Sequence, residues 1–134
     1  LDKLDFFINR RRENYDYLKK HLETIEGVMV AQATPNSEPS WFGMPITLNP
    51  KHPVNRENLL RFLEARKIGT RLLFAGNITK QPAYKEVNFR KIGSLENTDT
   101  VMLRSFWVGV YPGLTTQMLD YVIESISDFM TGKF

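Results

Sequence analysis

Four polar side chains gather around the one long stretch of this sequence that shows no regular period. Arg71 precedes residues 75–97, Asn77 and Gln81 lie near the first bend of this stretch, and Arg90 lies toward its end. Guanidinium groups bind phosphate through paired hydrogen bonds, and carboxamides bind hydroxyl groups. The residue types therefore predict a site that orients a polar, phosphate-bearing ligand, although any single arginine is more commonly part of a surface ion pair.

The stretch 75–97 is long for a connection inside a compact domain, and such loops are usually binding elements or disordered linkers. Its composition argues against disorder, because too many of its residues are apolar: Ile78, Tyr84, Val87, Phe89 and Ile92. Gly76-Asn77 permits a turn, and Gln81-Pro82 favours an extended approach. We therefore expect an ordered loop with a functional role.

Side chains that take part in acid–base, nucleophilic or metal chemistry are scarce. The sequence has no cysteine, which excludes disulfides, thiolate metal sites and a cysteine nucleophile, and which fits a cytoplasmic protein. We expect His21 and His52 to be surface residues, and no common nucleotide-binding, hydrolase or zinc motif is present. The chain alone predicts part of a polar-ligand site and no reaction.

The net charge of +3 and pI of about 9.2 are mildly basic. The densest run, Arg10 to Arg12, is followed at once by Glu13 and has no interleaved aromatic residues, so we interpret it as a solvated helix face and predict no nucleic-acid partner. No stretch reaches 18 consecutive apolar residues, so we expect no membrane span.

The first element is predicted from an apolar helical period that begins at Leu4 and ends at the turn around Gly27. Phe6 and Phe7 lie near its start. They either pack on protein mass outside this chain or cap the core of this chain, and the sequence favours neither. Because the chain begins without Met and already inside a helix, we expect it to be part of a longer protein.

Short strands are predicted over 28–30 and 41–48. In the second strand Phe42, Met44 and Ile46 share one face, and Pro45 favours an edge strand or a bulge because it cannot donate to a ladder. Further strands are predicted over 70–74 and 105–111.

Two more helices are predicted from their caps. Asn55 begins one that runs to about Arg66, and Thr115 begins one that ends near Gly132. The second is expected to bury Met118, Val122, Ile126 and Phe129. The pattern predicts one α+β domain over 1–134, in which a small, mainly antiparallel sheet has helices on one face and a long helix comes first.

Three segments together resemble one enzyme family. They are SWFGMPITL at 40–48, KIGTRLLFAGNITKQPAY at 67–84, and SLENTDTVMLRSFWVGVYPGLTTQMLDYV at 94–122. They look like the carboxyl-terminal small domain of NDP-4-keto-6-deoxyhexose 3-dehydratases, the group that includes CDP-6-deoxy-L-threo-D-glycero-4-hexulose 3-dehydrase. This group belongs to the DegT/StrS sugar aminotransferase superfamily, which has the type I aminotransferase fold.

The resemblance implies a pyridoxamine 5'-phosphate or PLP enzyme that removes the C3 hydroxyl of a sugar nucleotide in lipopolysaccharide deoxysugar synthesis. The cofactor and the catalytic base would lie in a large amino-terminal domain absent from this chain, and the complete enzyme would be a homodimer. Some members use an iron–sulfur cluster and a partner reductase, and others do not. The cluster cysteines would lie in the large domain, so the absence of cysteine here leaves both open.

The resemblance also gives Phe42 a meaning, because related aminotransferases tend to carry His at this position. A phenylalanine cannot donate a hydrogen bond or move a proton, so it favours the dehydratase branch, whereas its predicted strand face makes a core position equally consistent. The alternatives are an aminotransferase of the same superfamily and a stand-alone α+β binding module.

Overall fold

The computed structural model describes residues 1–133, whose strands form one antiparallel sheet in the order β1-β2-β4-β3. The strands are β1 (Val28–Val30), β2 (Gly43–Leu48), β3 (Thr70–Arg71) and β4 (Ser105–Gly109). The helices are α1 (Leu4–Leu22), α2 (Arg56–Ala65), α3 (Glu96–Arg104) and α4 (Thr116–Thr131). The predicted α+β class with a small antiparallel sheet is confirmed.

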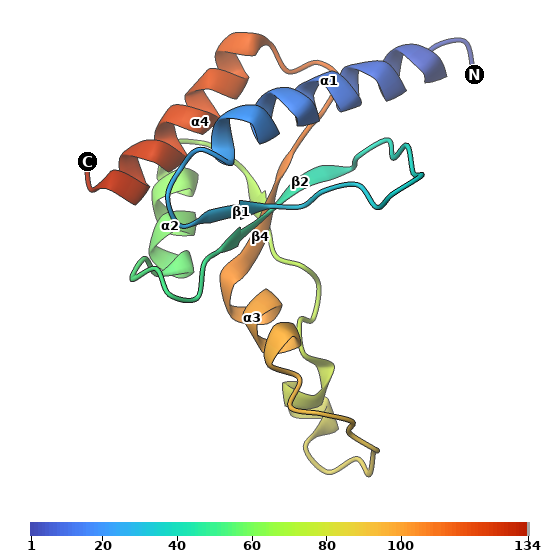
Figure 1. The fold of residues 1–134 in the computed structure, drawn as a ribbon, viewed down its shortest axis with the longest axis vertical. Helices are drawn as coiled ribbons and strands as arrows, with labels where there is room; N and C mark the ends of the chain where they lie inside the picture. The colour runs from blue at the N-terminus through green and yellow to red at the C-terminus, as the bar shows by residue number, and fades with distance from the viewer. Residues whose placement is uncertain (134) are drawn as a thin grey trace.

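The core lies between one face of the sheet and the helices α1, α2 and α4. Figure 1 shows α1 and α4 side by side across the sheet, with α2 next to α4. Alternate residues of the two central strands point into this core, as the period of two predicted. The fully buried apolar residues are Met44, Ile46 and Leu48 of β2, Phe106 of β4, Val110 just after β4, Tyr15, Leu18 and Leu22 of α1, Leu59 and Leu63 of α2, and Ile126 of α4.

Helix α1 ends at Leu22, five residues before the predicted end at Gly27. Gly27 does adopt a left-handed conformation (φ +82°), but it shapes the turn into β1 and its carbonyl accepts the Asn49 N–H at 2.8 Å. The partly buried Ile25 extends the apolar pattern beyond the helix. Phe6 and Phe7 are both exposed, so they do not cap the core of this chain.

Strand β2 is internal and pairs with β4 in continuous register through Pro45, so the prediction of an edge strand or a bulge there is wrong. The Pro45 carbonyl accepts the Ala31 N–H at 3.3 Å, just after β1 has ended at Val30. Because the N and C=O of a strand residue point to the same side, the missing N–H of Pro45 also faces the side where β1 ends. The hydrogen bond that this N–H would donate to the Ala31 carbonyl is replaced by one from the Tyr15 hydroxyl, which donates to the same carbonyl at 2.6 Å.

Both predicted helix caps are present. The Asn55 side chain accepts the N–H groups of Glu57 and Asn58, and Thr115 Oγ1 accepts the Met118 N–H. Gly132, at φ +72°, ends α4 as expected. Met118, predicted to be buried, is 53% exposed, because Leu119 occupies the inward position and continues to Val122, Ile126 and Phe129 at helical spacing.

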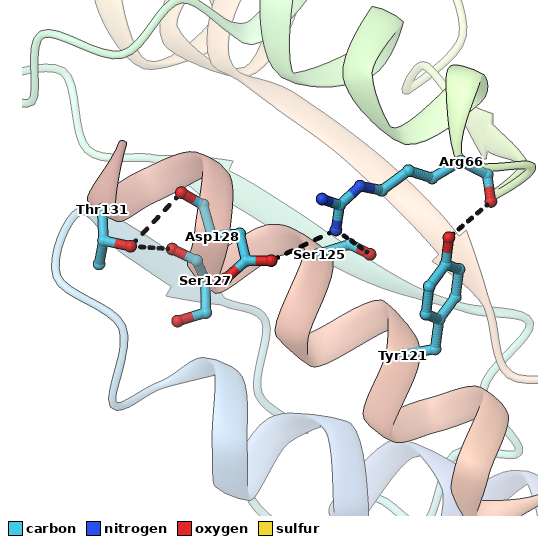
Figure 2. Close-up of polar contacts among 6 residues, drawn as sticks. All are labelled: Arg66, Tyr121, Ser125, Ser127, Asp128 and Thr131. Atoms are coloured by element: carbon cyan, nitrogen blue, oxygen red, sulfur yellow. Dashed lines mark hydrogen bonds and ion pairs between the residues drawn. The ribbon is translucent and has the colours of Figure 1, made fainter. Parts of the chain in front are cut away.

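Arg66 fastens the end of α2 to α4 (Figure 2). Its Nη1 lies 3.3 Å from both Ser125 Oγ and Asp128 Oδ2, and its backbone carbonyl accepts the Tyr121 hydroxyl at 3.3 Å. The guanidinium also stacks 4.3 Å from the centre of the Phe62 ring. These contacts hold the two helices in one orientation over the sheet.

Residues 72–95, here called the arm, extend away from the body of the fold together with α3 (Figure 1). The predicted strand over 70–74 is only Thr70–Arg71 long, and the predicted irregular stretch contains two short 3-10 helices, Ile78–Lys80 and Pro82–Tyr84. Helix α3 was not predicted. None of its residues is buried, so it contributes nothing to the core of this chain.

Candidate functional site

The sheet face opposite the core carries a row of side chains from three neighbouring strands, which we call the open face. The register pairs Trp107 of β4 with Pro45 of β2 on one side and with Arg71 of β3 on the other. Residues paired in this way point to the same face. Thr47 and Ser105 continue the row, with their hydroxyl oxygens 2.8 Å apart.

Phe42 lies against this open face and not in the core. Its side chain is 72% exposed, and its ring centre is 5.0 Å from that of Trp107 at an angle of 55°. The prediction that Phe42 shares the face of Met44 and Ile46 is wrong, because β2 begins only at Gly43 and the alternation does not extend back to residue 42. The core interpretation of Phe42 is thereby excluded.

Trp107 is the central residue of the open face and was missed by the sequence analysis. It lies across Gly43, where an added Cβ would come within 2.4 Å of Trp107 Cε3. Gly43 is therefore required by the position of the indole ring. The alternation of Phe106 and Val108 toward the core already implies that Trp107 points the other way, so the signal was present in the sequence.

The two arginines predicted to bind ligand lie apart in the structure, with no contact between them. Arg71 is exposed on the open face, and the only hydrogen bond of its guanidinium within residues 1–133 goes to the Thr70 carbonyl at 3.0 Å. Arg90 is exposed on the arm, and its side chain has no hydrogen bond or ion pair in the part of the chain that the structure describes. Both guanidinium groups retain donors for a ligand.

The two predicted carboxamides are engaged within the arm. Asn77 is only 2% exposed; its Nδ2 donates to Asp99 Oδ1 at 2.7 Å, and its Oδ1 accepts both the N–H and the hydroxyl of Thr79. Gln81 Nε2 donates to the Ala75 carbonyl at 2.6 Å. Both side chains therefore stabilise the conformation of the arm. They would affect ligand binding through that conformation and not by direct contact.

Asp99 of α3 is the second anchor of the arm. Lys80 Nζ lies 2.8 Å from its Oδ2, on the other side of the carboxylate from Asn77. The hydrogen bond from Lys80 and that from Asn77 lower the pKa of Asp99 below its ordinary value. The carboxylate therefore stays ionised and ties the arm to the helix that leads into β4.

The arm exposes more apolar surface than a solvated loop would. Phe74 is 99% exposed, and its backbone has a positive φ of 45°. Six further large apolar side chains of the arm are exposed: Leu72, Ile78, Tyr84, Val87, Phe89 and Ile92. A patch of this kind marks a contact surface for other protein mass or for a ligand.

A cavity of about 640 Å³ lies on the core side of the sheet, where α4 passes the ends of β3 and β4. Its lining is mainly apolar and includes Ile68, Tyr111, Met118 and Tyr121, with Arg66 at one side. The sequence analysis did not predict it. Since Val108 also lines it while Trp107 faces the opposite side, the cavity and the open face are separate features.

Neither histidine is placed for catalysis. The His21 ring packs 4.8 Å from that of Tyr17, and His52 Nδ1 accepts the Val54 N–H. Residues 1–133 contain no group of three or more His, Cys, Asp or Glu side chains that could hold a metal ion. Within the same residues, no helix combines the length and apolar character needed to cross a bilayer. The features described above can bind and orient a ligand.

Comparison with known proteins gives consistent matches. The model of the DegT/DnrJ/EryC1/StrS aminotransferase family matches residues 1–127. The chain is 48% identical to the lipopolysaccharide biosynthesis protein RfbH of Salmonella typhimurium strain LT2, over 100% of this chain and 31% of that protein. It is 49% identical to the dTDP-4-dehydro-2,6-dideoxy-D-glucose 3-dehydratase of Saccharopolyspora spinosa, over 97% of this chain and 28% of that enzyme.

Solved structures match in fold. The GDP-4-keto-6-deoxy-D-mannose 3-dehydratase of E. coli with bound hydrated PLP superposes with a TM-score of 0.84 at 26% identity, over 94% of this chain and 32% of that chain. A mutant of GDP-4-keto-6-deoxymannose 3-dehydratase with bound GDP-perosamine gives a TM-score of 0.84 at 25% identity, over 93% and 32% of the two chains. The chain thus spans about a third of the length of the proteins it matches.

Proposed function

We propose that this chain, which belongs to the DegT/DnrJ/EryC1/StrS aminotransferase family, is the carboxyl-terminal small domain of a sugar-nucleotide 3-dehydratase. The complete enzyme would remove the C3 hydroxyl of an NDP-4-keto-6-deoxyhexose. Two named 3-dehydratases among the matched proteins and the match to a lipopolysaccharide biosynthesis protein support this proposal.

The single observation that carries the proposal is the contact between Phe42 and Trp107 on the open face, because neither side chain can exchange a proton. Phe42, 72% exposed and in contact with Trp107, stands where the resemblance places a His in related aminotransferases. Phenylalanine can neither donate a hydrogen bond nor exchange a proton. Phe42 would therefore shape the sugar site without taking part in proton transfer, and the groups that remove the C3 hydroxyl would come from the large domain.

The described residues do not by themselves form a pyridoxamine phosphate site. Such a site needs a base next to the cofactor ring and a set of donors around its phosphate. Here Lys80 is paired with Asp99, both histidines serve local packing, and the open face offers a single guanidinium, that of Arg71. We therefore assign the cofactor mainly to the large domain.

The proposed role of this chain is to position the substrate. Arg71 and Arg90 would contact the diphosphate or the hydroxyl groups of the sugar nucleotide, and Phe42 would shape the hexose site. Asn77 and Gln81 would act by keeping the arm in place, since Asn77 already bonds to Asp99 of α3 and Gln81 to the Ala75 carbonyl within the arm. Positioning of this kind contributes to rate although none of these residues takes a proton.

The second candidate is a PLP-dependent sugar-nucleotide aminotransferase of the same family, which the fold supports equally well. The two differ in their product. A dehydratase product lacks the C3 hydroxyl, whereas an aminotransferase product keeps it and gains an amino group at C4.

The experiment that tests the proposal uses the complete enzyme and, separately, residues 1–134. Each is incubated with a CDP-, GDP- or dTDP-4-keto-6-deoxyhexose and excess pyridoxamine phosphate, with and without a reductase and its reduced nicotinamide as the source of two electrons. The products are separated by mass. We expect the complete enzyme to form a 3-deoxy product and residues 1–134 to form none. Turnover by residues 1–134 alone would show that the small-domain assignment is wrong.

A further inference from the structure

Trp107, Phe42 and Arg71 together have the chemistry of a two-part ligand site. The open face places an aromatic corner, made by the Phe42 and Trp107 rings at 55°, beside a guanidinium that is bonded within residues 1–133 only to the Thr70 carbonyl. The three residues come from or just before three neighbouring strands. Since strands lie about 4.8 Å apart, the row spans about 10 Å, the width of a hexose and its first phosphate.

The aromatic corner is preformed. Trp107 lies over the bare Cα of Gly43, so its ring position depends on a residue without a side chain. Thr47 and Ser105, joined at 2.8 Å, close the row beyond Pro45. Phe42 is held by Trp107 and otherwise faces outward, 72% exposed. A ligand that meets this corner encounters fixed ring faces, which lowers the ordering cost of binding.

The faces of aromatic rings carry negative potential and attract the slightly positive C–H groups of an apolar surface. The C–H face of a hexose is such a surface, and a 6-deoxyhexose adds a methyl group at C6. The free guanidinium donors of Arg71 suit a phosphate oxygen. The aromatic corner therefore complements the sugar, and the cation beside it complements the diphosphate.

We propose that Trp107 is a specificity-determining residue that receives the 6-deoxy sugar ring, with its C6 methyl, against Phe42 while Arg71 holds the diphosphate. This inference rests on the proposed function and adds a residue and a basis for selecting 6-deoxy sugars. In the alternative, another part of the complete enzyme packs on the Phe42 and Trp107 rings. The experiment below distinguishes this packing from sugar binding.

The experiment measures binding by calorimetry, so that it does not depend on turnover. The complete enzyme is titrated with a nucleoside diphosphate, its glucose derivative and its 6-deoxyglucose derivative, in the dTDP, CDP and GDP series. The tightest series is then used for the variants Trp107→Leu, Trp107→Phe, Phe42→Leu and Arg71→Ala. Thermal melts are recorded for all of them, and Phe42→Leu serves as the variant least threatening to folding because Phe42 is exposed.

We expect the wild-type enzyme to bind the 6-deoxy derivative about tenfold more tightly than the glucose derivative. Trp107→Leu should weaken binding of the 6-deoxy derivative by about tenfold and remove this preference, while the affinity for the nucleoside diphosphate stays unchanged. Trp107→Phe should retain most of the affinity, and Phe42→Leu should lose part of the preference. Arg71→Ala should weaken the binding of all three ligands by about the same factor.

Three outcomes would overturn the inference. Trp107→Leu and Phe42→Leu could leave every affinity unchanged while the melts drop, which assigns the rings to protein packing. Trp107→Leu could weaken the bare nucleoside diphosphate equally, which places the base and not the hexose on the indole. The wild-type enzyme could bind both sugars alike. The proposed function itself fails separately, by the product assay described above.

Discussion

The side-chain nitrogen Nδ2 of Asn77 donates to Oδ1 of Asp99 at 2.7 Å and so joins the base of the arm to α3. Lys80 binds the other oxygen of the same carboxylate, so a single acidic side chain fixes two points of the arm. Through α3, which leads directly into β4, these contacts connect the arm to the strand that carries Trp107. The arm is thereby an ordered extension of the open face.

Asn77→Ala should loosen the arm while leaving the body of the fold intact. The substitution removes the hydrogen bonds that the Asn77 side chain makes with Asp99 and with the N–H and hydroxyl of Thr79, while Lys80 still binds Asp99. Amide hydrogens of residues 75–85 should exchange faster, whereas those of β2 and β4 should be unchanged. Arg90→Ala is the matched control on the same arm. Equal exchange in Asn77→Ala and wild type would show that the arm is held by other contacts.

The stability of the fold should decrease as the pH rises above about 10. Tyr15 is buried, its hydroxyl donates to the Ala31 carbonyl at 2.6 Å, and burial raises its pKa to about 12. An unfolded tyrosine ionises near pH 10, so between these values the unfolded state has lost a proton that the folded state keeps. This stabilising contribution is complete below pH 10 and is lost as the pH approaches 12.

Melting temperatures between pH 8 and about 12 test this expectation, with Tyr15→Phe as the comparison. The variant should be less stable at neutral pH by about 0.5–1.5 kcal/mol, because one hydrogen bond is lost, and its alkaline decline should be shallower. A remaining slope is expected from Tyr17, whose pKa is raised chiefly by its hydrogen bond to Asp120. Identical slopes in wild type and variant would contradict the role of Tyr15.

Sequence patterns predicted the elements that bury one face and missed those that bury none. The alternation of Met44, Ile46 and Leu48 marked β2 correctly, and the caps at Asn55 and Thr115 marked where α2 and α4 begin. Helix α3 has only nine residues, none of them buried, and it directly follows the irregular stretch, so the sequence does not set it apart from that stretch. Pro45 favoured an edge strand, which is wrong, because an internal strand tolerates proline at a point where the neighbouring strand ends.

The ligand-binding role of the four polar residues stays a prediction, and the structure shows only how they are arranged. Arg71 pairs with Trp107 across β3 and β4 and so lies on the open face. Asn77 was expected to meet a ligand, but its burial and its bond to Asp99 depend on α3, which was not foreseen. Trp107 was not predicted as a site residue, although its alternation with Phe106 and Val108 indicates an outward position.

Arg71→Ala and Arg90→Ala should weaken binding of the sugar nucleotide by the complete enzyme with little loss of stability. A hydrogen bond to a charged group contributes about 1.5–3 kcal/mol, whereas an exposed arginine contributes little to folding. Titration of the sugar nucleotide against each variant, next to its thermal melt, measures both quantities. Wild-type affinity combined with a collapsed melt would make these arginines structural.

Phe42→His in the complete enzyme should lower the dehydratase rate while the fold is retained. The exposed position tolerates a ring of similar size, and the imidazole adds a group that can donate a hydrogen bond and exchange a proton beside Trp107. Turnover and melting temperature are compared with those of Phe42→Leu, which lacks the titratable group. Unchanged turnover with a much lower melting temperature would assign Phe42 a structural role.

The most direct test of the central claim is the structure of the product made by the complete wild-type enzyme. An NDP-4-keto-6-deoxyhexose is supplied with excess pyridoxamine phosphate and, in a parallel reaction, also with a reductase and its reduced nicotinamide, because replacing the C3 hydroxyl by hydrogen consumes two electrons. The hexose of the product is examined by NMR and mass spectrometry. The account predicts that C3 has lost its hydroxyl and carries two hydrogens, with no amino group at C4. A product that keeps the C3 hydroxyl and carries an amino group at C4 would contradict it and identify an aminotransferase.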